Sequence, residues 1–402
     1  MTEGLFAELV GQEAVVAQLE TAAVDAGAVV AARSAGGRVD RGAMTHAWLF
    51  TGPPGSGRSI AARAFAAALQ CPSPLPTGSA CGQCDACHQV LVGTHPDVAV
   101  IVPEGLSLSV REAREIIVRS SRAPTRGRWQ VTLIEDADRL TDEGANAVLK
   151  ALEEPPPHSV LMLCAPSTED LLPTVRSRCR LAALRTPSAT AVASVLVRRD
   201  GVDPAMAAFA ARAAQGHVGR AKRLATDEQA RTERRDVLAL PRSLGSVSAA
   251  LTAARDLVDA AKEESERRTA PRDAAEKASL ENALGAGATG KGVTGARGSA
   301  GAVKELEKRQ KSRGTRTSRD ALDRALVDLA AFYRDVLVVQ LGTGTDLVHA
   351  DLGEQIAVIA RATSPESTLR RIDAVLACRT AVDASVAPLL AVEALALSLR
   401  GA

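Results

Sequence analysis

The stretch HAWLFTGPPGSGRS, residues 46–59, decides the fold class. Its first six residues are mostly apolar and predict a buried strand, and the glycines after them predict a tight turn. Four residues separate the first glycine of the turn from the last, and a basic residue and a hydroxyl follow. This spacing between a strand and a helix is typical of a Walker A loop, whose backbone N–H groups bind phosphate. The candidate nucleotide-binding residues are Gly52, Gly55, Gly57, Arg58 and Ser59.

Three more apolar runs follow this first strand and alternate with helical patterns. Residues 98–102, 129–134 and 160–165 each predict a buried strand. Strands separated by helices predict a parallel sheet that binds ligands at the carboxyl ends of its strands. Residues 1–186 are therefore expected to form an α/β domain.

The rest of the chain has helical patterns only. Residues 187–240 predict a small helical domain, and residues 241–402 predict a helical bundle whose apolar stripes fit either a core or an oligomer interface. Within the bundle, residues 262–319 combine charge runs with a glycine-rich tract and predict a flexible, low-complexity insertion. Its basic residues could contact DNA, but a solvated linker is the preferred interpretation.

Two departures indicate that the nucleotide site is degenerate. The Walker A pattern has lysine where this chain has Arg58, whose guanidinium is larger and planar. The usual acidic motif has Asp on Mg²⁺ followed by Glu on the attacking water, but here Glu135 precedes Asp136. Each exchange moves a carboxylate by about one methylene, and a displacement near 1 Å can cost about a hundredfold in rate. ATP and Mg²⁺ stay candidate ligands, but hydrolysis is not expected.

Four cysteines directly after the loop's helix have the spacing of a metal site. Nine residues separate the first two cysteines, and two residues separate each later pair. Paired thiolates two residues apart suit structural zinc, and a redox use of the last pair is the alternative. Two nearby histidines, His88 and His95, are expected to be surface or supporting residues. The candidate zinc ligands are Cys71, Cys81, Cys84 and Cys87.

Composition narrows the class of protein. The 402 residues are 46% hydrophobic, and the formal net charge is +2. This balance does not match a stand-alone DNA-binding domain, which is usually strongly basic. No secretory signal and no membrane span are expected, so the chain is predicted to be cytoplasmic.

Several motifs together resemble those of the bacterial clamp-loader branch of the AAA+ ATPases. Besides the loop and the cysteines, they are LVGQE at residues 9–13, LKALEEPP at residues 149–156, and Ser-Arg-Cys at residues 177–179. The resemblance covers roughly residues 3–225. It implies a RecA-like AAA+ domain with a zinc insertion, a helical lid and a helical collar.

The resemblance also implies a role for each part. In this family the arginine of Ser-Arg-Cys, here Arg178, reaches across a subunit interface to the γ-phosphate of ATP on a neighbour. A second sensor arginine normally follows Gly-x-x, but Arg220 comes one place late after Gly216. An intact finger beside degraded ATPase motifs is typical of a stator subunit. The implied partners are clamp-loader subunits of the gamma/tau and delta types and, indirectly, the sliding clamp and primer–template DNA.

Two alternatives stay open at this point. The chain could be an ATP-hydrolysing motor subunit of the same family that tolerates Arg58. It could also be a zinc-dependent protein that binds DNA or another protein and keeps an unused phosphate loop. No polymerase site is visible, so any polymerase activity would belong to an assembly.

Overall fold

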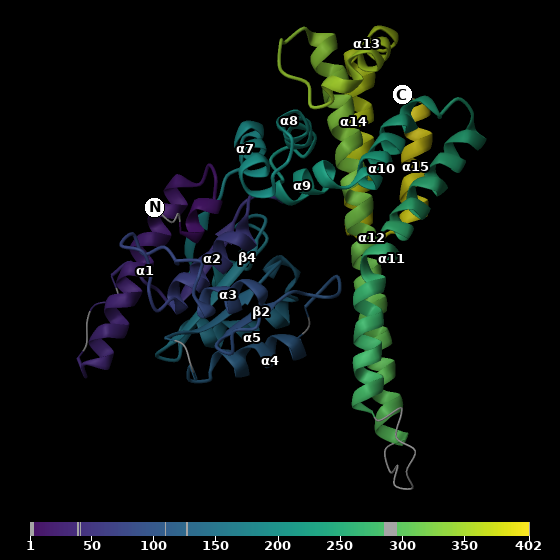
Figure 1. Ribbon diagram of the computed structural model, residues 1–402. Helices are drawn as coiled ribbons and strands as arrows, with labels where there is room; N and C mark the ends of the chain where they lie inside the picture. The colour runs from purple at the N-terminus through teal and green to yellow at the C-terminus, as the bar shows by residue number, and fades with distance from the viewer. Residues whose placement is uncertain are drawn as a thin grey trace. The chain divides into compact units, whose positions relative to one another are not determined.

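The protein divides into two compact units, Met1–Thr226 and Asp227–Ala402. Unit 1 contains a parallel sheet flanked by helices, and the described part of unit 2 is all helical (Figure 1). The predicted fold class, an α/β domain followed by all-α domains, is confirmed. The computed structural model describes residues 4–37, 40, 42–108, 110–125, 128–284 and 296–401.

Five parallel strands form the sheet of unit 1, in the order β2-β3-β4-β1-β5. The apolar runs predicted four of them. The fifth, β5, was not predicted, because it is an edge strand with only one buried residue among its four. The strands are β1 (Ala47–Thr51), β2 (Val98–Ile101), β3 (Gln130–Ile134), β4 (Ser159–Ala165) and β5 (Arg180–Ala183).

Nine α-helices pack in unit 1 as the structure describes it. The α2 helix is buried from Ala64 to Gln70, because its many alanines allow close packing against the sheet. The helices are α1 (Glu13–Ser34), α2 (Arg58–Gln70), α3 (Asp85–Val92), α4 (Val110–Ser120), α5 (Asp142–Glu153), α6 (Pro173–Arg176), α7 (Ala189–Asp200), α8 (Pro204–Ala213) and α9 (Val218–Thr226). The last three are the small helical domain predicted from the sequence.

The α1 helix bears on the expectation that the chain has no membrane span. By length and composition it is the one described helix apolar enough to cross a membrane. Helices that pack in the core of a globular domain pass the same test. Along one face of α1, Val15, Leu19 and Ala22 are buried in the core of unit 1.

Unit 2 is built from long helices around an apolar core that includes Leu326, Phe332 and Val336. The first of them, α10, packs within unit 2, so the small helical domain ends near residue 226 and not at residue 240. The helices are α10 (Glu228–Ala239), α11 (Val247–Ala283), α12 (Ala296–Leu341), α13 (Gly353–Ala362), α14 (Pro365–Asp383) and α15 (Pro388–Gly401).

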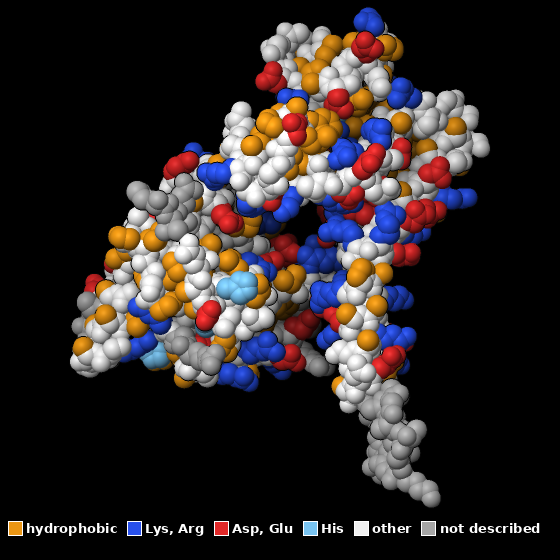
Figure 2. All heavy atoms as spheres, viewed as in Figure 1, with side chains coloured by type: hydrophobic (Ala, Val, Ile, Leu, Met, Phe, Trp, Pro, Cys, Tyr) orange, Lys and Arg blue, Asp and Glu red, His pale blue; other side chains and the backbone are white. Residues whose placement is uncertain are grey.

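The predicted flexible insertion is corrected by the structure. Residues 262–283 and 296–319 belong to α11 and α12, which form a long antiparallel hairpin (Figure 1). Buried ion pairs replace an apolar seam here, and Arg313 binds Asp273 at 2.6 Å. Many Lys and Arg side chains cover the hairpin (Figure 2). The glycine-rich residues 285–295 lie outside the described part of the chain.

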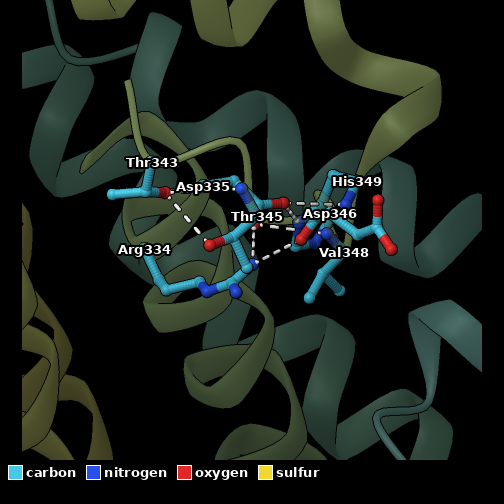
Figure 3. A network of polar contacts seen from close by, with 7 residues as sticks. All are labelled: Arg334, Asp335, Thr343, Thr345, Asp346, Val348 and His349. Carbon is cyan, nitrogen blue, oxygen red and sulfur yellow. Dashed lines mark hydrogen bonds and ion pairs between the residues drawn. The ribbon is translucent and has the colours of Figure 1, made fainter. Parts of the chain in front are cut away.

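A buried carboxylate anchors the loop after α12 (Figure 3). Asp335 and His349 are both fully buried. Asp335 accepts hydrogen bonds from the backbone N–H groups of Val348 and His349, and the His349 Nδ1 atom lies 2.9 Å from its Oδ2 atom. Burial alone would raise the pKa of Asp335, but these hydrogen bonds, led by that of the His349 side chain, hold the pKa below its usual range. The loop is therefore fixed to α12 by one acidic side chain.

Replacing Asp335 by alanine is expected to lower the free energy of unfolding of unit 2 by about 3–5 kcal/mol, because His349 and two backbone N–H groups lose their buried partner. Denaturant unfolding followed by far-UV circular dichroism measures this loss. The unfolding transition of unit 1, followed by the fluorescence of Trp48 and Trp129, should stay the same as in the wild type. Asp346→Ala is the matched control, since that side chain is exposed, and it should cost less than about 0.5 kcal/mol. Equal losses in both variants would contradict the anchoring role.

Candidate functional site

The phosphate loop has the backbone shape that its glycines predict. It leaves the buried strand β1 at Thr51 and enters α2 at Arg58. Gly52, Gly55 and Gly57 have φ angles of 148°, 87° and 94°, which other residues rarely adopt. The loop therefore lies at the amino end of α2, where backbone N–H groups and the helix dipole favour an anion.

The side chains around this loop are engaged within the protein. The Arg58 guanidinium donates a hydrogen bond from Nη1 to the carbonyl oxygen of Gly52, so it lies against the loop's own backbone. Gln12 donates to the carbonyl oxygens of Ser56 at 3.3 Å and Arg185 at 2.7 Å. Gln12, part of the LVGQE motif, thus ties the loop to the segment that follows β5.

The acidic motif at the end of β3 is also occupied by protein groups. Arg63 of α2 donates from Nε and Nη2 to Glu135 Oε1 at 3.1 and 2.9 Å. Asp136 has a φ angle of 50°, and its Oδ2 atom lies 3.9 Å from Arg139 Nε. Burial and the neighbouring Asp136 carboxylate raise the pKa of Asp138. The positive charge of Arg63 beside the Glu135 carboxylate disfavours a Mg²⁺ ion there.

The small helical domain covers the loop through His217. A Cβ atom added to Gly55 would lie 2.4 Å from the Cα and Cγ atoms of His217, so only glycine fits there. Beside the loop, a cavity of about 20 Å³ is lined by residues that include Leu9, Ile60 and Val192. This volume holds about one water molecule, whereas small-molecule sites typically span about 300–1,000 Å³. This cavity is therefore too small for a nucleotide base in this conformation.

Arg178 lies near the amino ends of the strands, whereas the phosphate loop lies at their carboxyl ends. Arg178 precedes β5, in which Arg180 pairs with Trp48 at the amino end of β1, whereas the phosphate loop follows the carboxyl end of β1. At about 3.3 Å per residue, this register separates Arg180, the first residue of β5, from the loop by roughly 13 Å along the strands. Arg178 therefore lies before the amino end of β5, whereas the phosphate loop of its own chain follows the carboxyl end of β1.

The surroundings of Arg178 keep its side chain at the surface. Val175 is fully buried, and Cys179 packs against the core on the other side, where burial raises its pKa to about 12. Between them, the Arg178 side chain is 37% exposed and binds Glu153 Oε1 at 2.7 Å. Because Glu153 is itself 50% exposed, this ion pair contributes at most about 1 kcal/mol. The guanidinium also donates to the Thr174 carbonyl oxygen at 2.9 Å, and because all of these contacts are exposed, exchanging Glu153 for another anion should cost little.

The four predicted zinc ligands form one cluster. Their Sγ atoms all lie within 4.8 Å of one another. The Sγ–Sγ distances are 3.6 Å for Cys71–Cys81, 4.0 Å for Cys71–Cys84 and 3.9 Å for Cys81–Cys87. A tetrahedral ion with Zn–S bonds of about 2.3 Å requires sulfur atoms about 3.8 Å apart. The cluster fits a metal ion such as zinc.

Local structure supports this cluster on two sides. Cys84 caps α3 by accepting a hydrogen bond from the Cys87 N–H, and a hydrogen bond from the backbone of Gln83 helps to lower the pKa of Cys81 to about 6. Burial raises the pKa of Cys71 and Cys87. The thiols of the cluster therefore differ in pKa, and a bound metal ion would favour the deprotonated form of each.

Some contacts at these sites could not be found from the motifs. The structure places the loop glycines, Arg58 and Ser59 after the carboxyl end of β1. Glu135 and Asp136 follow the carboxyl end of β3, which β4 separates from β1. The sequence did not predict that Arg63 pairs with Glu135, that His217 lies against Gly55, or that Glu153 pairs with Arg178. Arg63 had one usable signal, because it follows Ser59 by four residues and so lies on the same helical face.

Comparisons with known proteins agree with the motifs. A family model described as DNA polymerase III, delta subunit, matches residues 34–188. The delta' subunit of Pseudomonas aeruginosa is 38% identical over 174 residues, which are 43% of this chain and 52% of that protein. The matched segment is similar to DNA polymerase III subunits of the clamp-loader type. The resemblance inferred from the motifs is thereby confirmed.

Other DNA polymerase III subunits also match part of the chain. The Escherichia coli delta' subunit is 39% identical over 144 residues, which are 35% of this chain and 43% of that protein. The Mycobacterium tuberculosis gamma/tau subunit is 35% identical over 174 residues, which are 43% of this chain and 27% of that protein. The matches thus span about half the length of the delta' relatives and less of the gamma/tau relatives.

Solved structures give weaker similarities. The Thermotoga maritima RuvB branch migration motor has a TM-score of 0.36 at 18% identity, over 59% of this chain and 66% of that chain. A gamma subunit-related DNA polymerase III protein from the same organism has a TM-score of 0.30 at 16% identity, over 69% of this chain and 94% of that chain.

Proposed function

We propose that this chain is a delta'-type stator subunit of a bacterial DNA polymerase III clamp loader, and that Arg178 completes the ATP site of a neighbouring gamma/tau-type subunit. The observation that carries the proposal is the placement of Arg178, which is exposed and lies near the amino ends of the strands, whereas the phosphate loop of the same chain lies at their carboxyl ends. A guanidinium in this position can stabilise charge on a triphosphate held by another chain. With gamma/tau-type and delta-type partners, the cytoplasmic assembly would load a sliding clamp onto primer–template DNA.

The proposal includes a structural zinc ion and an inactive nucleotide site. Cys71, Cys81, Cys84 and Cys87 would hold Zn²⁺, which crosslinks the segment between α2 and α3. The chain's own loop would not support hydrolysis, because Arg58 binds Gly52, His217 covers Gly55, and Arg63 occupies Glu135.

Purified chain should hydrolyse no ATP, and Arg58→Lys should not restore hydrolysis, because Glu135 and Asp136 stay in exchanged order and Glu135 stays paired with Arg63. Phosphate release measured with saturating ATP and Mg²⁺ tests this expectation, with a hydrolysing gamma/tau subunit as the positive control. Turnover by Arg58→Lys at the rate of that control would show that the lysine was the only missing part. Turnover by the wild type that is lost in Arg58→Ala would make the chain a motor subunit instead.

Reconstitution tests the subunit assignment itself. The chain is mixed with gamma/tau-type and delta-type subunits of the same bacterium, and complexes are separated by size exclusion. We expect one stable complex that contains this chain, and we expect clamp loading only when the chain is present. Full assembly and loading without the chain would refute its assignment to the clamp loader.

A further inference from the structure

Positive charge is concentrated on one helix of the α11–α12 hairpin. Residues 296–320 carry eight Lys or Arg and three Asp or Glu side chains, a net charge of +5, although the whole chain has a net charge of only +2. The facing residues 262–283 carry five basic and six acidic side chains, a net charge of −1. The two helices of the hairpin therefore differ in charge.

Acidic side chains of α11 are used inside the hairpin. Glu264 binds Arg324 of α12 at 2.6 Å. The Arg313 side chain, only 9% exposed, binds Asp273 at 2.6 Å and Glu276 at 2.9 Å. Because these carboxylates face the seam and are neutralised there, they do not reduce the positive potential on the outer face of α12.

Three lysines lie on that outer face. Lys304, Lys308 and Lys311 follow i, i+4, i+7 spacing, on the helix side opposite the buried residues Leu306 and Arg313. All three are exposed, and none of them forms an ion pair with another described residue. At 1.5 Å per residue they extend over about 10 Å along a straight helix. We define these three residues as the lysine stripe.

We propose that the lysine stripe binds the phosphate backbone of duplex DNA. Lysine ammonium groups on flexible side chains contact phosphates without reading bases, and duplex DNA presents a negative charge about every 1.7 Å along its axis. Exposed Glu307 lies on the same face, but the three lysines leave this straight row with a net positive charge that suits such a linear polyanion. A protein partner would need an apolar centre, and the positions that share this face, from Lys304 to Thr315, offer no large apolar side chain.

Fluorescence anisotropy of the full chain with a labelled duplex of about 30 base pairs tests this binding, over about 50–200 mM salt. The triple variant Lys304→Gln, Lys308→Gln, Lys311→Gln should bind about 10- to 100-fold more weakly at low salt. It should also lower the slope of log affinity against log salt by about 2.7, because three phosphate contacts are lost. Glutamine favours helix, so the melting curve of the variant should match that of the wild type.

A matched control changes the net charge by the same amount at other exposed lysines. Lys222→Gln, Lys262→Gln, Lys277→Gln should keep wild-type affinity and slope. Equal weakening in both triple variants, or no binding of the duplex by the wild type, would overturn the proposal. Binding of a polyglutamate peptide in place of the duplex would assign the stripe to an acidic protein and overturn it too. Arg178 is unaltered in these variants, so the DNA-binding test and the finger test fail separately.

Discussion

Replacing Arg178 by alanine should lower the rate of ATP hydrolysis about a thousandfold at the one site that it completes, while the clamp-loader complex still assembles. The expected size follows from the charge that an arginine finger stabilises in the transition state of phosphoryl transfer. Because Arg178 is exposed and its neighbours Val175 and Cys179 make the packing contacts, the substitution should leave the fold intact. Single-turnover hydrolysis by the reconstituted complex measures the effect as a new slow phase, and clamp loading should fall with it.

Two further variants make this test specific. Arg176→Ala is the matched control, since Arg176 is an exposed neighbour that pairs with Glu169 at 3.6 Å. It should change the rate less than about twofold. Arg178→Lys keeps the charge but loses the planar fork and should be intermediate. Unchanged hydrolysis and loading in Arg178→Ala would refute the finger role, whatever the state of the zinc site.

Removing zinc should destabilise unit 1 by at least about 4 kcal/mol, because binding of structural zinc supplies folding free energy directly. Wild-type protein should contain about one zinc ion per chain, and Cys81→Ser should contain none. The loss should be visible at Trp129, since the Gln70 side chain next to Cys71 donates to the Trp129 carbonyl oxygen. Elemental analysis and thermal unfolding followed by tryptophan fluorescence measure both effects.

Two controls separate zinc loss from the cost of any substitution. Cys378→Ser alters a buried cysteine of unit 2 and should keep zinc and the stability of unit 1. His88→Ala should also keep zinc, because four thiols already complete the coordination shell. A wild-type protein that is free of metal and unfolds at the same temperature with and without a chelator would contradict a structural zinc site.

The sheet and the cysteine cluster were predictable because their signals are local. Four apolar runs marked four strands, and the spacing of Cys81, Cys84 and Cys87 marked a metal site before any contact was known. The strand Arg180–Ala183 was missed because an exposed edge strand needs few apolar residues. Hydrophobic patterns report burial, so they reveal the four buried strands and miss the exposed one.

The hairpin was predicted wrongly for a different reason. Low-complexity, charged sequence was interpreted as unable to bury a core, and that reasoning assumed an apolar core. The hairpin uses buried ion pairs such as Arg313 with Glu276, together with alanine, glutamate and lysine residues that favour helix. Arg313 and Asp273 are 40 positions apart, and pairing over such a separation leaves no local pattern in the sequence.

The same limit applies to the phosphate loop. Its glycines and its departures from the Walker A pattern were visible in the sequence, but the contact between Gly55 and His217 joins segments more than 150 residues apart in number. The exchanged order of Glu135 and Asp136 can be read from the sequence. The pairing of Arg63 with Glu135 depends on the fold and cannot.

The α2 helix has a mechanical consequence. It starts at Arg58 in the phosphate loop and ends at Gln70, directly before the first cysteine of the cluster. Its 13 residues form a buried rod about 20 Å long. A rod of this kind transmits displacement along its axis, so a spectroscopic reporter placed beside the cysteines, for example cobalt in the zinc position, would register events at the far end of the helix.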